Sequence, residues 1–402
     1  MTSMISASDA ETLIRTRLAD YATQSLPIDS AAGAVLRQPI VAERDQPPFD
    51  RVTMDGIAIR FDELADSGRH FNIAAMQTAG MPPMALTQAG SCIEVMTGAV
   101  MPQGCDTVIP VEQTQRNESG LSVSAHYLPQ RGQFIHRRGS DCHAGDTLIN
   151  TGARLRAPEI AVIAANAYAR ITVARPPRIS VLATGDELVN VDAAVLGWQI
   201  RRSNDRALAA MLTSRGLLDV QLGHVSDDRD ALKAAIAARL EARDVLILSG
   251  GVSMGQRDFV PDVLHELGVE RVFHKIAQRP GKPMWFGIGP RGQAVFALPG
   301  NPVSALVCGT RYVLPGLLGA MGLRARAPAR VMLAASIDFA APLTYFVPVQ
   351  LRSDDAGLPS ATLLPPATSG DFSALTQTDG FVELPAMQSH FPAGFLATYY
   401  PW

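Results

Sequence analysis

The sequence predicts a multidomain α/β plus β fold, and three observations support this prediction. At 402 residues the chain is longer than one hydrophobic core usually serves, so we expect roughly two to four domains. Strand-like and helix-like segments alternate between residues 179 and 319, which indicates a doubly wound parallel sheet with right-handed crossovers. Short β-branched runs separated by Gly, Pro and Asn fill residues 35–150 and recur after residue 326, which indicates mainly β regions on both sides.

Two helices are predicted in the N-terminal half. Residues 8–21 begin with a Ser-Asp-Ala-Glu capping pattern, and their apolar residues recur at helical spacing. Residues 157–168 carry Pro158 at a position that suits the first turn of a helix. The proline pair within residues 174–178 then marks a boundary, after which the α/β pattern begins.

The remaining predicted elements follow this boundary. Strands of the α/β part are expected at residues 179–184, 220–225, 244–248 and 295–298. Its helices are expected at residues 205–215, 230–242, 260–267 and 302–319. The C-terminal β part is expected to contain strands at residues 329–335, 344–352, 380–384 and 396–400.

The composition and charge exclude several classes of function. Hydrophobic residues make up 47% of the chain and charged residues 18%, which is typical of a folded soluble protein. With 35 basic and 38 acidic side chains, the formal charge of −3 argues against nucleic-acid and anionic-membrane binding, so any anion site must be local. The N-terminus lacks a secretion-signal pattern, and no later segment approaches a membrane-spanning length without charges. Because the four cysteines are also widely separated, we expect a cytoplasmic protein with reduced thiols.

A glycine- and serine-rich loop follows the strand predicted at residues 244–248. Gly250 and Gly251 let the backbone turn tightly and approach a ligand, while Ser249 and Ser253 supply hydroxyl groups. Taken alone, such a loop is more often a plain strand-to-helix turn. In an open α/β sheet, however, ligands bind at the carboxyl ends of strands, so the loop suggests a phosphate or another oxyanion.

A basic turn comes roughly twenty residues later. Lys275, Arg279 and Lys282 surround a Pro-Gly turn that could present all three cations to one anion at little ordering cost. A lone motif of this kind is usually a solvated turn. Because one helix and one strand separate it from the serine loop, both loops can lie on the same rim of the sheet.

A third loop, at residues 298–304, again joins a strand to a helix. Pro299 and Pro302 make this turn rigid, and Asn301 or Ser304 can cap the helix or donate to a ligand. Capping explains one of these polar residues but not the rigidity of the turn.

Acidic residues follow the first α/β strand. Thr184 and Gly185 suit an oxyanion, whereas Asp186 and Glu187 would repel one unless a divalent cation intervenes, so we expect magnesium. Further carboxylates follow other strands of the same unit, namely Asp227, Asp228 and Asp258. Each carboxylate alone is usually a helix cap or a solvated turn residue. Together with the three anion-suited loops, they indicate a metal and phosphate site.

Two segments in the N-terminal half are predicted to be β-turns from their composition alone. Residues 47–58 form a stiff proline entry into a loop with Asp50 and Asp55. Residues 137–146 form a mixed-charge turn that contains Asp141. Their meaning depends on the rest of the chain.

Eight motifs spaced along nearly the whole chain resemble those of the MoeA type of molybdopterin molybdenumtransferase, which is similar to the C-terminal domain of gephyrin. The motifs are Pro48-Phe-Asp50 with Met54-Asp-Gly56, Met96-Thr-Gly98 with Pro102-x-Gly-x-Asp106, Gly139-x-Asp141 with Ala144-Gly145, Thr184-Gly-Asp-Glu-Leu188, Ser203-Asn204, Ser249-Gly-Gly-Val-Ser-x-Gly255 with Asp258, Pro280-Gly-Lys-Pro283, and Pro299-Gly-Asn-Pro302. One such match is weak evidence, whereas eight in order are highly specific.

The resemblance implies a homodimer of four-domain subunits. Its domains would be a helical linking domain (1–42 and 144–176), an inserted mainly β domain (43–143), a molybdopterin-binding α/β domain (177–325) and a C-terminal β barrel (326–402). It also implies the reaction, in which adenylylated molybdopterin loses AMP while molybdate is inserted, with Mg²⁺ required. Possible partners are a molybdopterin adenylyltransferase and the molybdoenzymes that accept the product.

The resemblance also assigns residues, with the active site at the subunit interface. The catalytic residues would be Asp55, Asp141, Glu187, Asp228 and Asp258. The metal ligands would be Asp186, Glu187 and Asp258. The residues that bind pterin phosphate, AMP or molybdate would be Thr184, Ser249, Gly250, Gly251, Ser253, Lys275, Arg279, Lys282, Pro299, Pro302, Ser369 and Ser373.

The match has departures and leaves alternatives open. Arg279 replaces a Lys of some members, Ile57 replaces a common Tyr, and residues 205–206 change the polar surroundings after Ser-Asn. The related adenylyltransferase has a similar α/β domain, but its loop reads Thr-Gly-Gly-Thr-Gly and it lacks the flanking β domains. A catalytically silent scaffold is the alternative from another class, against which the carboxylates and the intact basic turn argue. A preference for tungstate over molybdate also stays open.

Overall fold

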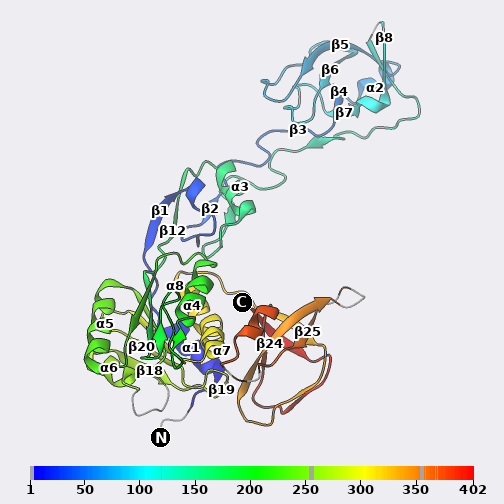
Figure 1. The fold of residues 1–402 in the computed structure, drawn as a ribbon. Coiled ribbons are helices and arrows are strands. Elements are labelled where there is room, and N and C mark those ends of the chain that lie inside the picture. The colour runs from blue at the N-terminus through cyan, green and yellow to red at the C-terminus, as the bar shows by residue number, and fades with distance from the viewer. Residues whose placement is uncertain are drawn as a thin grey trace. The chain divides into compact units, whose positions relative to one another are not determined.

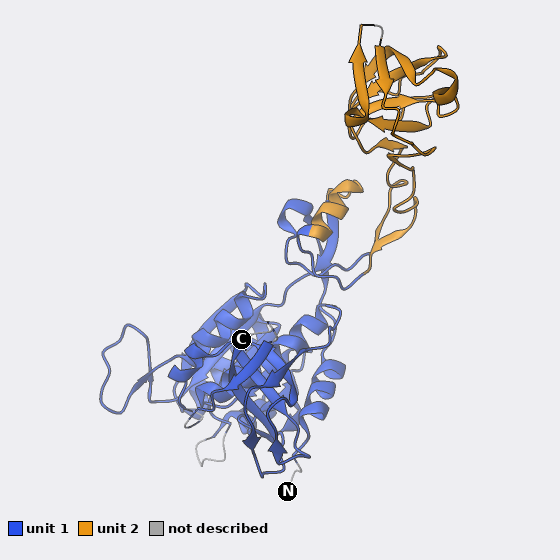
Figure 2. Ribbon diagram, turned by 90° about the vertical axis from the view of Figure 1, so that its right-hand side faces the viewer, with its two compact units in different colours: residues 1–38, 151–157, 170–402 blue, residues 39–150, 158–169 orange. Residues whose placement is uncertain are grey.

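The computed structural model describes residues 4–118, 120–252, 258–353, 357, 359–366, 368 and 370–402. The chain forms two compact units, which Figure 2 colours separately. Unit 1 comprises residues 1–38, 151–157 and 170–402, and unit 2 comprises residues 39–150 and 158–169. The finer division into four domains stays a prediction.

A six-stranded sheet forms the centre of the α/β part of unit 1 (Figure 1). In spatial order its strands are β16 (Val220–Val225), β13 (Ile179–Thr184), β17 (Val245–Ser249), β21 (Ala294–Leu298), β20 (Trp285–Ile288) and β18 (Glu270–His274). The first four strands run parallel, as predicted. Strands β20 and β18, which the sequence did not predict, add an antiparallel hairpin at one edge.

Helices cover both faces of this sheet. They are α1 (Ala7–Arg17), α4 (Asn204–Thr213), α5 (Arg229–Ala242), α6 (Val260–Glu266), α7 (Pro302–Cys308) and α8 (Leu314–Ala320). Helix α1 begins with a capping box in which Ser6 and Asp9 exchange hydrogen bonds. The predicted helix 302–319 is interrupted by one π-helical segment, η3 (Gly309–Val313), which separates α7 from α8.

The α7–α8 region is the most apolar helical segment of the described chain. By length and composition alone, residues Pro302–Ala320 could cross a membrane, with a mean hydropathy of 1.3, although they include the charged Arg311. This window is 72% buried within the protein, and the core helix of a soluble protein passes the same test.

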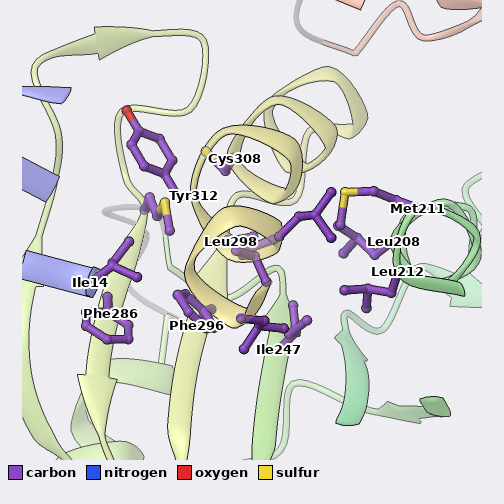
Figure 3. Close-up of a cluster of buried hydrophobic side chains, with 14 of the residues drawn as sticks. Ile14, Leu208, Met211, Leu212, Ile247, Phe286, Phe296, Leu298, Cys308 and Tyr312 are labelled. Carbon is purple, nitrogen blue, oxygen red and sulfur yellow. The ribbon is translucent and has the colours of Figure 1, made fainter. Parts of the chain in front are cut away.

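Successive side chains of each strand point to opposite faces of the sheet, so a hydrophobic core forms on each face. On one face, Ile247 and Phe296 pack with Ile14 of α1 and Leu208 of α4 (Figure 3). On the other face, the neighbouring strand residues Leu246, Leu248 and Val295 pack with residues of α5 and α6. The sheet is therefore buried on both sides, which fixes the loops at its rim.

The C-terminal part of unit 1 is a closed β barrel. Its strands follow the order β19 (Gln278–Arg279), β24 (Thr344–Ser353), β25 (Pro359–Leu363), β22 (Ala329–Leu333), β28 (Leu396–Pro401) and β26 (Gly380–Leu384). Pairing between β24 and β26 closes it. Strand β19 belongs to the basic turn, so the barrel is hydrogen-bonded to a predicted site loop.

Unit 2 contains another six-stranded sheet. Its order is β7 (Thr107–Pro110), β4 (Gly56–Ile59), β6 (Ser91–Val95), β5 (His70–Gln77), β9 (Gly120–Val123) and β8 (Thr114–Asn117). Gly56 is required here, because a Cβ atom would lie 1.9 Å from the Ile109 carbonyl oxygen.

Short elements complete both units. The short helices are α2 (Glu63–Asp66) and α3 (Ala157–Ala165). The 3₁₀ segments are η1 (Ile28–Ser30), η2 (Val111–Gln113) and η4 (Ser373–Gln377). The strand pairs are β1 (Thr23–Pro27) with β12 (Arg170–Ala174), β2 (Ile40–Val41) with β11 (Thr147–Ile149), β3 (Arg51–Val52) with β10 (Ile135–His136), β14 (Leu188–Val189) with β15 (Ile200–Arg201), and β23 (Ile337–Asp338) with β27 (His390–Phe391).

Candidate active site

A cavity of about 950 Å³ lies at the carboxyl ends of three parallel strands in unit 1. The loops that follow β13, β17 and β21 line it, together with the start of α4. This is the rim at which open α/β sheets bind ligands. Two of the three loops singled out in the sequence for anion binding, the serine loop and the proline loop, therefore meet here with the acidic loop after β13, whereas the basic turn contributes only Pro283.

The serine-rich loop approaches the β13 loop very closely. Gly250 has a φ of +104°, and a Cβ there would lie 2.7 Å from the Thr184 carbonyl oxygen. At Gly251, with a φ of +67°, a Cβ would lie 2.7 Å from a methyl group of Val260. Both glycines are thus needed for the tight packing of the rim. The predicted contribution of Ser253 lies outside the described residues.

Thr184 offers an unused polar group to this cavity. The residue is 5% exposed, and its hydroxyl has no hydrogen-bond partner among the described residues. A buried hydroxyl without a partner is costly, so a ligand that bonds to it would gain from satisfying it.

Asn204, at the start of α4, joins two of the three loops. Its side-chain amide donates to the Ser249 hydroxyl at 2.9 Å and to the Gly300 carbonyl at 2.7 Å. The sequence had singled out Asn204 only through the family resemblance. Its structural role is to set the spacing between the serine loop and the proline loop.

Carboxylates gather on another side of the cavity. Glu187, Asp227 and Asp258 line it, and the backbone amide of Asp227 donates to the Asp186 carboxylate at 3.0 Å. Burial, followed by the negative charges of the neighbouring carboxylates, raises the pKa of the Asp227 side chain. This region therefore carries surplus negative charge that a cation would relieve.

The structure places Asp227 and its neighbour Asp228 differently. Asp228 is the N-cap of α5 and accepts a hydrogen bond from the Ala231 amide at 2.8 Å. It is exposed and does not line the cavity, whereas Asp227 does. The catalytic role of Asp228 stays a prediction, and Asp227, which the sequence analysis named only as one of several carboxylates near this rim, is the residue that lines the cavity.

The described residues do not form a ready-made metal site. Among them, no three His, Cys, Asp or Glu side chains are grouped so that they could hold a metal ion. Magnesium nevertheless fits the carboxylates described above, because it keeps several water ligands and is usually held by one or two carboxylates together with substrate phosphates.

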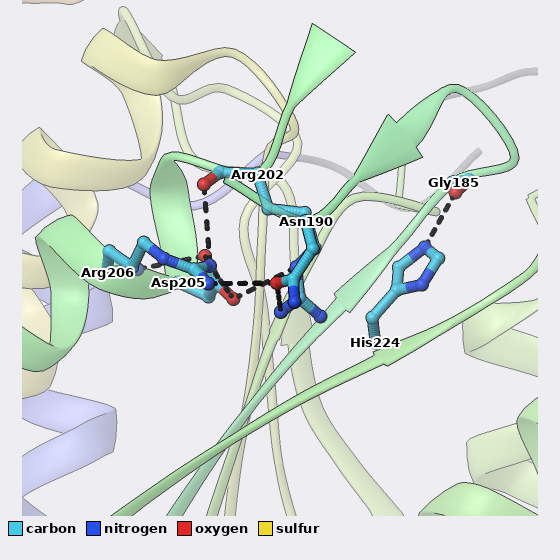
Figure 4. Close-up of polar contacts among 6 residues, drawn as sticks. All are labelled: Gly185, Asn190, Arg202, Asp205, Arg206 and His224. Carbon is cyan, nitrogen blue, oxygen red and sulfur yellow. Dashed lines mark hydrogen bonds and ion pairs between the residues drawn. The ribbon is translucent and has the colours of Figure 1, made fainter. Parts of the chain in front are cut away.

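A buried ion-pair network fixes the wall formed by α4 and the segment after β14 (Figure 4). Asp205 has no exposed surface and accepts from the Arg206 guanidinium at 3.1 Å. Arg202 and Arg206 both donate to the Asn190 side-chain oxygen, at 2.9 and 3.0 Å. His224 contacts the Gly185 carbonyl, in the loop after β13, at 2.9 Å. These contacts hold the mouth of the cavity in a defined shape.

A second cavity, of about 330 Å³, adjoins the first. Pro283, Pro299 and Asn301 line both cavities and so form a shared wall. Arg279 and Lys282 line the second cavity, and none of its described lining residues is Asp or Glu. Lys275, predicted to act with them, lines neither cavity.

A buried glutamine holds the basic turn in place. Gln278 is 1% exposed, accepts from the Tyr312 hydroxyl and donates to the Pro280 carbonyl at 3.0 Å. At Gly281 a Cβ would lie 2.5 Å from the Cys308 sulfur. The guanidinium of Arg279 lies over the Phe339 ring at 5.9 Å. The turn is therefore positioned by the π-helical segment and the barrel together.

The barrel reaches the first cavity through a short loop. Gly370 and Phe372 line the cavity. Ser373 does not, and its hydroxyl donates instead to Asp371 at 3.0 Å. Ser369 lies outside the described residues. The predicted serine contribution of the barrel stays a prediction.

Asp55 and Asp141 belong to unit 2. The backbone amide and the hydroxyl of Thr97 each donate to Asp55 Oδ1 at 2.7 Å and lower the pKa of its carboxyl. Asp141 Oδ1 lies 2.7 Å from His136 Nε2. Each carboxylate is thus held in a fixed orientation within its own unit. Their predicted meeting with the carboxylates of unit 1 stays a prediction.

Comparison with known protein families defines the class of this site. Residues 180–319, which form the α/β part, match the family described as a probable molybdopterin binding domain. Residues 5–167 match the MoeA N-terminal region (domain I and II), and residues 330–402 match the MoeA C-terminal region (domain IV). The site is therefore that of a molybdopterin-binding domain between MoeA regions.

The chain belongs to the molybdopterin molybdenumtransferase (MoeA) family. It is 39% identical over 401 residues to the molybdopterin molybdenumtransferase of Synechocystis sp., covering 99% of this chain and 100% of that protein. The enzyme of the same name from Synechococcus elongatus is 33% identical and covers 93% of each chain. The crystal structure of the molybdopterin biosynthesis MoeA protein from Pyrococcus horikosii aligns with a TM-score of 0.80 at 28% identity, covering 99% of each chain.

Proposed function

We propose that the chain inserts molybdate into adenylylated molybdopterin and releases AMP, with magnesium required, to give molybdenum cofactor. Family membership makes the chain a transferase of molybdenum cofactor biosynthesis. The proposal adds the two substrates, the leaving group and the metal.

The shared wall between two unlike cavities carries this proposal. The first cavity contains carboxylates and an unpaired hydroxyl, which suit a phosphoanhydride accompanied by a divalent cation. The second contains two cations and no described carboxylate, which suits a tetrahedral oxyanion such as molybdate. Substrates bound in the two cavities would lie on opposite sides of Pro283, Pro299 and Asn301.

Residues of the first cavity would act on the adenylylated substrate. The Thr184 and Ser249 hydroxyls and the backbone amide of Gly251 would bind the phosphates, while Gly250 and Pro302 would shape the loops around them. Magnesium would be held by Asp186, Glu187 and Asp258, and when bound it would neutralise charge on the phosphoanhydride. Ser253 remains part of this set by resemblance.

Residues of the second cavity would hold molybdate. Arg279 and Lys282 supply positive charge at the cavity surface, and Pro299 keeps the wall rigid. Lys275 would contribute only long-range attraction, because it does not line the cavity. Ser369 and Ser373 stay assigned to this substrate region by resemblance alone.

We extend the proposal to a cytoplasmic homodimer whose active site lies at the subunit interface. Asp55 and Asp141 would then act with Glu187, Asp258 and either Asp227 or Asp228. The product would pass to acceptor molybdoenzymes, and a molybdopterin adenylyltransferase would supply the substrate.

Release of AMP from adenylylated molybdopterin tests the proposal. We expect release to require both molybdate and magnesium, and the comparison of molybdate with tungstate to report oxyanion preference. We expect Lys282→Ala to raise the half-saturating molybdate concentration about tenfold or more, because it removes a charge-assisted contact. Lys233→Ala is the matched control, since Lys233 pairs with Glu266 on the surface.

Three outcomes would contradict the proposal. AMP release that is independent of molybdate would refute the insertion step. Accumulation of adenylylated product from ATP and molybdopterin without molybdate would favour an adenylyltransferase. Equal half-saturating molybdate concentrations for Lys282→Ala and wild type would show that the second cavity does not bind molybdate.

A further inference from the structure

Three consecutive basic residues in unit 2 each pair with a different carboxylate. His136 Nε2 lies 2.7 Å from Asp141 Oδ1, Arg137 Nη1 donates to Asp50 Oδ2 at 2.6 Å, and Arg138 Nε donates to Asp45 Oδ2 at 2.9 Å. Asp141 is therefore the one of these three carboxylates that pairs with an imidazole, whose ring nitrogens can each either donate or accept a hydrogen bond.

A neighbouring arginine determines which nitrogen of His136 carries the proton. Strands β10 and β3 place His136 directly opposite Arg51, and Arg51 Nη2 lies 3.0 Å from His136 Nδ1. A guanidinium can only donate, so Nδ1 must accept. In the neutral imidazole the proton is then on Nε2, where it donates to Asp141.

The Asp141 carboxylate is anchored through one oxygen. Among the described residues, its side-chain hydrogen bonds come from His136 and, at 3.4 Å, from the Ser140 hydroxyl, and both go to Oδ1. The Asp141 backbone amide donates to the Gln46 carbonyl at 2.9 Å, which fixes the main chain beneath it. The side chain is 55% exposed, so its second oxygen is accessible to a ligand.

We propose that His136 is a positioning residue for Asp141, with Arg51 holding its imidazole in the tautomer that donates to Oδ1. The contact keeps Oδ2 directed to the substrate. The inference rests on the proposed catalytic role of Asp141.

Two substitutions of His136, with one control, test the inference in the full-length protein. His136→Ala removes the donor, so we expect kcat for AMP release to fall about tenfold with little change in KM. His136→Gln keeps an N–H donor, so we expect it to recover kcat to within about threefold. His143→Gln, in the same turn, should match wild type in both kcat and KM.

Nitrogen NMR of the His136 ring supplies a readout independent of activity. We expect a protonated Nε2 and an unprotonated Nδ1 at pH 8, and loss of this preference in Arg51→Ala. A protonated Nδ1 at that pH would overturn the inference.

The kinetic outcomes separate this inference from the proposed function. If Asp141→Asn abolishes AMP release while His136→Ala leaves kcat unchanged, the positioning role is refuted and the function stands. If Asp141→Asn turns over normally, the catalytic role of Asp141 fails and the positioning role fails with it.

Discussion

Asn204 donates a hydrogen bond to the Ser249 hydroxyl at 2.9 Å and thereby links the start of α4 to the serine loop. The second bond of the same amide, to Gly300, extends the link to the proline loop. One side chain thus sets the distance between two loops that come from different strands.

We expect Asn204→Ala to lower kcat/KM for AMP release by about 10- to 100-fold, because loops displaced by even an ångström lose productive geometry. The steady-state assay measures this, and circular dichroism should show an unchanged fold. The control is Asn72→Ala, at an exposed position on β5. Equal effects of both substitutions would show that the Asn204 link is not specific.

We expect substitutions of Asp227 and Asp228 to differ in their effects on stability and activity. Because its pKa is raised, the ionised Asp227 carboxylate destabilises the folded protein at neutral pH, and this cost disappears as the pH falls and the carboxyl protonates. We expect Asp227→Asn to raise Tm at pH 7 by about 1–2 °C after allowance for solvent screening, to lose that gain towards pH 4, and to lower activity about 100-fold.

Asp228→Ser serves as the comparison. A serine can still cap α5, so we expect near-normal stability and activity. Asp228→Ala removes the cap and should lower the free energy of unfolding by about 1 kcal/mol. Loss of AMP release in Asp228→Ser with normal release in Asp227→Asn would return the catalytic assignment to Asp228.

The buried Arg311 side chain forms ion pairs that connect η3, α1 and β26 in unit 1. Its side chain is 6% exposed and pairs with Glu11 of α1 and Glu383 of β26, each at 2.8 Å. We expect Arg311→Met to lower the free energy of unfolding by about 3 kcal/mol, because Glu383 would lose its cation and keep only the hydrogen bond from the Tyr400 hydroxyl. Denaturant titration measures this. Arg352→Met, at an exposed arginine of β24, should change stability by less than about 0.5 kcal/mol, and similar losses in both would contradict the prediction.

Gly281 and Gly292 form a matched pair of glycines. Both have positive φ, +91° and +81°, but a Cβ meets the Cys308 sulfur at 2.5 Å in the first case and no atom within 4 Å in the second. We expect Gly292→Ala to lower the free energy of unfolding by about 1 kcal/mol, which is the backbone strain alone. We expect Gly281→Ala to lower it by about 2–3 kcal/mol and also to weaken molybdate binding. Thermal unfolding and molybdate titration measure the two effects, and equal losses of stability would exclude the steric contribution.

The sequence predicted the parts of the site that depend on strand ends. Loops containing Ser249, Thr184 and Pro299 were expected on one rim because parallel strands end together, and the structure brings them to one cavity. The hairpin of β18 and β20 was missed, since both strands are short, β18 begins with the charged Glu270 and Arg271, and β20 contains Gly287, all of which weaken the periodic pattern.

The distinction between adjacent carboxylates could not be read from the sequence. Asp227 and Asp228 have the same chemistry, and their separation into a cavity residue and a helix cap depends on where α5 begins. Lys275 was grouped with Lys282 by spacing, but the chain turns between them and directs only Lys282 to the cavity.

The two-residue strand β19 limits how this protein can be dissected. Gln278 and Arg279 pair in parallel with Thr344 and Tyr345 of the barrel, so the cation-bearing turn takes part of its backbone support from residues more than sixty positions later. A truncated α/β fragment would keep the serine loop but lose that support. Such a fragment would therefore be a poor substitute for the whole chain in measurements of oxyanion affinity, and chimaeras should exchange the turn and the barrel together.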